Sequence, residues 1–133
     1  MTNFNYILNK RKDIMSEEKK TENLIIKEIE EQYPETTKEF KRIMREQYEI
    51  FCIKQSNYGP DNISLGKDLT KEEDRKMSQM GLFFRLNDKI QRIKQLVVIG
   101  NKDNVGESVD DTYKDLSNYG IIAQIVKSGK WGK

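Results

Sequence analysis

The chain has 133 residues, of which 35% are hydrophobic and 35% are charged. This length fits a single domain of ordinary size. The 24 Lys and Arg residues nearly balance the 22 Asp and Glu residues, so the formal net charge is only +2. This balance gives no strong signal for duplex nucleic acid or an anionic membrane as a partner, because proteins that bind these usually carry a basic patch or block.

The residue types that are missing or rare exclude several kinds of catalytic and metal site. The chain has no His and a single cysteine, Cys52, which excludes Ser-His and Cys-His nucleophile pairs, His-ligated zinc and an internal disulfide. No run approaches the roughly 20 apolar residues that a membrane span needs. Residues 1–15 have no apolar signal-peptide core. We therefore expect a cytoplasmic protein.

Helical periodicity dominates the chain, and no convincing strand alternation is present. Residues 1–15 are expected to form a loose or weakly helical lead-in. Helices are expected over residues 16–33, 37–56, 70–80, 83–98 and 107–127, with a loop at 57–69 and a kink or break at Gly81. The sequence predicts an all-α protein, a compact bundle of four to five helices. Its expected parts are an N-terminal lead-in and helix (1–36), a helical domain (37–127) and a flexible tail (128–133) that carries Trp131.

In the helix over 16–33, the apolar residues keep a spacing of three to four: Leu24, Ile25, Ile29 and Tyr33. Two further helices have a clear apolar stripe, which should face the core. In the helix over 37–56 the stripe consists of Phe40, Ile43, Met44, Tyr48 and Phe51. In the helix over 83–98 it consists of Phe83, Leu86, Ile90, Ile93 and Val97.

The last helix carries a stripe of acidic residues. Glu107, Asp111 and Asp115 follow one another at intervals of four, so their carboxylates lie along one side of the helix. Like charges at this spacing destabilise a helix by roughly 0.2–0.5 kcal/mol per pair, and a hard divalent cation would compensate. The preference of acidic residues for a helix N-terminus is the alternative explanation, but Asp115 lies beyond the first turn. The stripe predicts a site for Mg²⁺ or Mn²⁺.

The preceding helix carries a complementary basic stripe. It consists of Arg85, Lys89 and Arg92, with Asp88 inside it. The stripe is either a solvated face or a phosphate-binding face, in which arginine offers a bidentate fork. If it faces the acidic stripe, these four residues bind the ligand, together with Tyr119 near Asp115.

The helix over 37–56 contains a lysine, Lys54, within its apolar stripe. A buried lysine without a partner is costly, so Lys54 either reaches out to solvent or points into a polar pocket. The same helix carries an ExxE pair, Glu46 and Glu49. The loop that follows offers amide, carboxyl and aromatic groups that suit the recognition of a base: Asn57, Tyr58, Asp61 and Asn62. The sequence has no Walker-type phosphate-binding motif.

Three motifs occur in a fixed order along the chain. They are Lys54-Gln-Ser-Asn-Tyr-Gly, Gly81-Leu-Phe-Phe-Arg-Leu-Asn-Asp-Lys-Ile-Gln-Arg and Glu107-Ser-Val-Asp-Asp-Thr-Tyr-Lys-Asp-Leu-Ser-Asn-Tyr. Together they resemble the nucleotide modification-associated domain, type one, a small all-helical family of bacteria and their phages. The resemblance covers residues 37–127. It implies a nucleotide or modified nucleotide as ligand, in a bacterial or phage-infected cell.

A looser resemblance links the chain to the all-α nucleoside triphosphate pyrophosphohydrolases, the MazG-like and dimeric dUTPase group. Those enzymes hold Mg²⁺ with an ExxE pair and a later ExxD pair, which here match Glu46 with Glu49 and Glu107 with Asp110. The resemblance implies a homodimeric, Mg²⁺-dependent hydrolase with Glu46, Glu49 and Lys54 as catalytic residues. On the helical wheel, Asp111 and Asp115 are better placed than Asp110 to bind the metal.

Two other functions are compatible with the same residues. One is a noncatalytic protein that binds, and thereby sequesters, a nucleotide or a nucleotide-like signal in the same pocket. The other is a helical adaptor for another protein, which would show an exposed apolar patch and no pocket.

Overall fold

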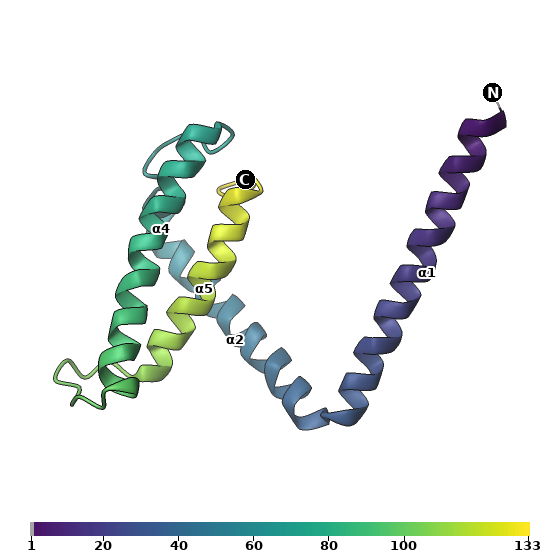
Figure 1. Cartoon of the computed structure of the whole chain (residues 1–133). Coiled ribbons are helices and arrows are strands. Elements are labelled where there is room, and N and C mark those ends of the chain that lie inside the picture. The colour runs from purple at the N-terminus through teal and green to yellow at the C-terminus, as the bar shows by residue number, and fades with distance from the viewer. Residues whose placement is uncertain (1) are drawn as a thin grey trace. The chain divides into compact units, whose positions relative to one another are not determined.

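The computed structural model describes residues 2–133, and this part of the chain contains helices and no strand (Figure 1). The elements are α1 (Thr2–Gln32), α2 (Pro34–Tyr58), α3 (Asp61–Ser64), α4 (Glu72–Ile93), the π-helical turn η1 (Lys94–Val98) and α5 (Val109–Lys127). The predicted all-α class is confirmed. None of the described helices is both long and apolar enough to cross a membrane.

The chain divides into two compact units within helix α2. Unit 1 is Met1–Glu46 and unit 2 is Gln47–Lys133, whereas the sequence placed a boundary between residues 36 and 37. Unit 1 contains α1 and the beginning of α2. Unit 2 contains the rest of α2 and all later elements.

Several helix boundaries differ from the sequence-based expectation. Helix α1 begins at Thr2, so the segment expected to be a loose lead-in is helical. Pro34 opens α2, because the first helical position needs no N–H partner and matches the fixed φ of proline. Gly81 does not interrupt α4. A glycine weakens a helix by about 1 kcal/mol, and the burial of the next residue, Leu82, in the core offsets this loss.

The core of unit 2 is built mainly from the later helices and the C-terminal segment. Among the described residues, the buried apolar side chains are Ile63, Leu69, Leu82, Ile122, Val126 and Trp131. Helices α4 and α5 run antiparallel, side by side (Figure 1). The Ser78 hydroxyl donates a hydrogen bond to the Ile63 carbonyl at 2.7 Å, which fixes α3 against α4.

The C-terminal segment is part of this core, so the expectation of a frayed tail is wrong at Trp131. The indole is only 7% exposed. Its Nε1–H donates to the Pro60 carbonyl at 2.9 Å, and its ring meets Phe51 edge-to-face with 6.1 Å between centroids. The neighbouring glycines suggested flexibility, but burial of a large aromatic ring outweighs their conformational entropy.

The apolar stripes predicted to face the core are largely exposed. The exposed members are Phe40, Ile43, Met44 and Tyr48 on α2, Phe83 and Ile90 on α4, and Val97 on η1. The buried positions are instead Gln47 on α2, 7% exposed, and Ser78 and Leu82 on α4, each 2% exposed. Packing against α5 covers the side of α4 next to the predicted stripe, and helical periodicity alone does not say which of two adjoining faces is covered.

Trp131 provides a direct test of the docked C-terminal segment. We expect Trp131→Ala to lower the free energy of unfolding by about 3–5 kcal/mol, as large-to-small core substitutions do. Trp131→Phe should cost about 1 kcal/mol, because it mainly removes one hydrogen bond. Chemical denaturation followed by circular dichroism measures both. Lys130→Ala, at an exposed neighbouring position, is the control, and equal stabilities for Trp131→Ala and this control would contradict the docked segment.

Candidate functional site

A cavity of about 290 Å³ lies in unit 2. Side chains from α2, α3, α4 and α5 line it: Phe51, Lys54, Gln55, Tyr58, Asn62, Ile63, Arg85, Asp115, Asn118, Tyr119 and Ile122. The volume is close to the lower end of the range for small-molecule sites, roughly 300–1,000 Å³. Aromatic and aliphatic walls with a few polar and charged groups are typical of such sites.

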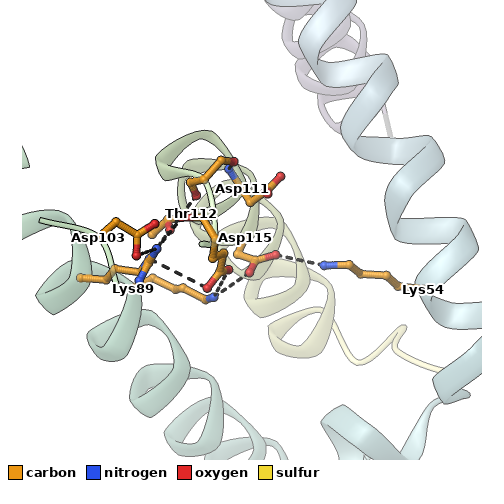
Figure 2. A network of polar contacts seen from close by, with 9 residues as sticks. Lys54, Lys89, Asp103, Asp111, Thr112 and Asp115 are labelled. Carbon is orange, nitrogen blue, oxygen red and sulfur yellow. Dashed lines mark hydrogen bonds and ion pairs between the residues drawn. The ribbon is translucent and has the colours of Figure 1, made fainter. Parts of the chain in front are cut away.

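Asp115 of α5 lies at the centre of a polar network that joins three helices (Figure 2). Its Oδ1 accepts a hydrogen bond from Lys54 Nζ of α2 at 3.1 Å. Its Oδ2 lies 2.8 Å from Lys89 Nζ of α4. The side chains of Asp115 and Lys89 are 18% and 21% exposed, whereas that of Lys54 is 51% exposed. Lys54 is therefore the member of the network that solvent or a ligand reaches most easily.

The ionisation of these groups follows from their pairing. Burial raises the pKa of the Asp115 carboxyl, but hydrogen bonds from Lys89 and Lys54 and their charges outweigh this, so that its pKa lies below the ordinary value. The pKa of Lys89 is raised, chiefly by its hydrogen bond to Asp115. Both shifts favour the charged pair at neutral pH.

Arg92 of α4 anchors the segment that leads into α5 and does not line the cavity. Its guanidinium donates to the Glu107 carbonyl at 2.6 Å and to Thr112 Oγ1 at 3.2 Å, and lies 3.4 Å from the Asp103 carboxylate. Thr112 is fully buried. Ser108 caps the start of α5 by accepting a hydrogen bond from the backbone N–H of Asp111. These contacts set the rotation of α5 that brings Asp115 to the cavity.

The three predicted metal ligands do not converge. Both oxygens of Asp115 face ammonium groups, Glu107 pairs with Lys89 and Arg92, and Asp111 is exposed. In residues 2–133, no three Asp, Glu or Cys side chains come together in a way that could hold a metal ion. Carboxylates neutralised by lysine do not fit Mg²⁺, which needs oxygen ligands to replace its waters. The expectation of Mg²⁺ or Mn²⁺ stays a prediction.

Arg85 links the wall of the cavity to the segment that contains α3. Its guanidinium donates to the Asn62 carbonyl at 2.8 Å and lies 5.7 Å from the centroid of the Tyr119 ring, within cation–π distance. The side-chain Oδ1 of Asn62 is buried and has no hydrogen-bond partner among the described residues. An unsatisfied buried acceptor costs about 1–3 kcal/mol, so a turn of the Asn62 side chain that brings Oδ1 to an N–H donor on a ligand would be favourable.

The structure brings six of the fifteen predicted site residues to the cavity. Those that line the cavity are Lys54, Tyr58, Asn62, Arg85, Asp115 and Tyr119. Lys89 reaches it only through Asp115. The exposed predicted residues outside the lining are Glu49, Asn57, Asp61, Asp88 and Asp111.

The predicted ExxE pair does not contribute to the cavity. Glu46 belongs to unit 1, where it pairs with Arg42 at 2.9 Å. Glu49 is exposed and does not line the cavity. The proposed catalytic role of these two residues therefore has no support in the geometry of the cavity.

The sequence interpretation missed several lining residues, notably Phe51, Gln55 and Asn118. For Phe51 the sequence predicts only a core position. Asn118 lies three residues after Asp115, and residues at this spacing share one side of a helix, so the acidic stripe already contained a signal for it. Gln55 directly follows Lys54 and carried no comparable signal.

Fold and site together define an all-α protein in which antiparallel helices hold a Lys–Asp–Lys network beside a cavity. Residues 75–126 match a family model described as nucleotide modification associated domain 1. The matched segment contains the second and third sequence motifs and supports the first resemblance. It begins after α2, so it does not include the residues of α2 that line the cavity. No curated protein and no solved structure matches the chain. The looser resemblance to MazG-like enzymes gains no support from these comparisons.

The Asp115 network predicts a specific pH dependence of stability. The lowered pKa means that the carboxylate stabilises the fold above its ordinary pKa of about 3.9, and that this contribution is lost as the pH falls through the folded-state value. We expect Asp115→Asn to lower the free energy of unfolding by about 1–2 kcal/mol at pH 7, because a half-buried charge pair loses one partner. The difference between the variant and the parent should disappear in acid.

Denaturant titrations across the acidic range test this expectation. Asp111→Asn is the matched control, because it removes one carboxylate from the same helix at an exposed position. Its effect should stay near 0.5 kcal/mol, as for charges at a helix N-terminus. If the two variants lost the same free energy of unfolding at every pH, the Asp115 network would stabilise the fold no more than an exposed carboxylate does.

Proposed function

We propose that unit 2 binds a nucleotide in the cavity between α2, α4 and α5 and acts by binding it rather than by hydrolysing it. The observation that carries this proposal is the lining of the cavity, in which cations, amides and tyrosine rings face one space. Such a combination suits a ligand with an anionic group at one end and a flat, hydrogen-bonding ring at the other. The match of residues 75–126 to a nucleotide modification associated domain agrees with this chemistry.

The phosphate would bind at Lys54 and Arg85. An ammonium group has three donors, and one of those on Lys54 meets Asp115. The lining contains two cations and one carboxylate, so a net positive charge favours an anion. The half-exposed side chain of Lys54 can turn toward a phosphate while Lys89 keeps Asp115 paired.

The base would lie among the tyrosine rings and amides. Tyr58 and Tyr119 offer faces for stacking, which is worth about 1–3 kcal/mol per base in nucleic-acid binders. Gln55 and Asn118 line the same space, and their amides can donate to and accept from a base edge. The buried Asn62 Oδ1 adds an acceptor that has no partner within the described chain.

The geometry gives less support to hydrolysis than to binding. Hydrolysis of a nucleoside triphosphate requires an activated water, supplied by a metal ion or by a general base. Asp115 is the carboxylate in the lining, and two lysines lower its pKa and occupy its oxygens. A carboxylate with a lowered pKa is a weak base. The hydrolase predicted from the sequence is tested by the release of pyrophosphate.

The first test is calorimetric titration of the full chain with nucleoside monophosphates and triphosphates. We expect Lys54→Ala to weaken binding about tenfold, because a charge-assisted hydrogen bond to phosphate contributes about 1.5 kcal/mol or more. Lys76→Ala removes the same charge from an exposed position outside the lining and should leave the affinity unchanged. Equal losses for the two variants would indicate a nonspecific charge effect.

The same titration, repeated with EDTA and with Mg²⁺, shows whether nucleotide binding requires a metal ion. We expect similar affinity in EDTA and in excess Mg²⁺, with no pyrophosphate released in either case. Binding that requires Mg²⁺, together with pyrophosphate release, would overturn the proposed function and restore the hydrolase predicted from the sequence.

A second prediction concerns the base. An unpaired acceptor at Asn62 should favour bases with an exocyclic amino group, such as adenine or cytosine, over uracil, which lacks one. We expect about a fivefold preference, corresponding to a net hydrogen-bond contribution near 1 kcal/mol. Asn62→Ala should abolish this preference, whereas Tyr58→Ala should weaken the binding of all nucleotides to the same extent. If neither variant changes any affinity, this segment does not recognise the ligand.

A further inference from the structure

Unit 1 has an unusual pattern of exposure for a folded segment. Among residues 3–46, whose side chains the structure describes, not one residue is buried. Helices in proteins owe most of their stability to the packing of an apolar face. The helices of unit 1 carry such faces, and nothing within this unit covers them.

The uncovered apolar residues gather where α1 meets α2. We call this region the elbow, residues 24–44. Its large apolar side chains, which are between 39% and 65% exposed, include Ile25, Ile26, Ile29, Tyr33, Phe40, Ile43 and Met44. A groove of about 260 Å³ runs between the two helices here, lined by Ile25, Ile26, Ile29, Thr37 and Phe40 with Glu30 and Lys41 at its charged edge. Glu30 and Lys41 pair with each other.

We propose that a second copy of this chain covers the elbow. In a two-fold arrangement, the apolar ridge of each elbow fills the groove of the other, and the four helix segments form a small bundle. A two-fold interface requires a surface that is complementary to itself. The elbow meets this requirement, because it carries a groove beside Ile29 and, outside the lining of that groove, the exposed apolar side chains of Tyr33 and Met44, which form the ridge.

The balanced charge of residues 1–46 favours a second copy of the chain over nucleic acid or a membrane as the partner of the elbow. Residues 1–46 contain ten Lys and Arg residues and ten Asp and Glu residues. A neutral surface of mixed charge does not attract nucleic acid or an anionic membrane, which select basic surfaces. It also does not repel an identical copy.

The size of the surface agrees with a specific dimer. A standard interface buries roughly 800 Å² on each partner. The two aromatic side chains of the elbow, Tyr33 and Phe40, are more than half exposed, and a side chain of this kind buries about 150–250 Å² in full. Together with the five exposed aliphatic side chains beside them, they form the apolar centre that an interface of this size needs. This inference does not depend on nucleotide binding by unit 2.

Sedimentation of the full chain over a range of micromolar concentrations tests the proposal. We expect a dimer that dissociates on dilution, and an untagged copy that co-purifies with a tagged copy. Ile29→Glu should weaken association by at least about 100-fold, because it places an unpaired charge in the interface. Asn23→Glu adds the same charge at an exposed position outside the groove and should leave the dimer intact. A parent protein that stays monomeric at all concentrations would overturn the proposal.

Hydrogen exchange provides a measurement that does not depend on a variant folding correctly. In the parent protein, amide protection of residues 24–44 should rise with protein concentration, whereas protection of α5 should not change. Protection of residues 24–44 that is strong and independent of concentration would mean that another part of the same chain covers the elbow. Weak protection at every concentration would mean that nothing covers it. Either result contradicts a dimer formed through this surface.

Discussion

The arrangement of unit 2 depends on one carboxylate held between two lysines. Asp115 is largely shielded from solvent and receives Lys54 from α2 and Lys89 from α4. A shielded charge is tolerated only when it is paired and hydrogen-bonded. Asp115 therefore restricts how the three helices lie against one another, since any movement that separates it from both lysines leaves an unpaired charge.

The same network divides the basic residues of α4 between two tasks. Lys89 and Arg92 are tied to acidic groups and backbone carbonyls near the start of α5, so they hold the structure together. Arg85 faces the cavity and supports the segment around Asn62. Residues of one charge on one helix thus differ in role, because small differences in their angle around the helix axis bring them to different neighbours.

The two units also differ in the source of their stability. Unit 2 has a core that includes the C-terminal Trp131 and two fully buried residues, Val126 and Thr112. Unit 1 has long helices with many i, i+3 and i, i+4 ion pairs, such as Arg42 with Glu39 and Glu46. Exposed pairs of this kind contribute little to stability, because solvent screens the charges and ordering two long side chains costs entropy. The helices of unit 1 therefore need a covering surface, while unit 2 carries its own.

The sequence by itself determined the all-α class, the approximate positions of the long helices and the unusual placement of Lys54 and Asp115, because helical periodicity and charge spacing are local properties of the chain. Tertiary structure alone decided which face of each helix is covered, and it docked Trp131 onto the core although glycines surround it. It also decided how the acidic stripe is neutralised. Spacing along α5 showed that carboxylates share one side of the helix, but the cations that compensate Asp115 come from α2 and α4. Contacts between residues so distant in the sequence leave no periodic signal, so a metal ion and a pair of lysines could not be told apart until the helices were packed.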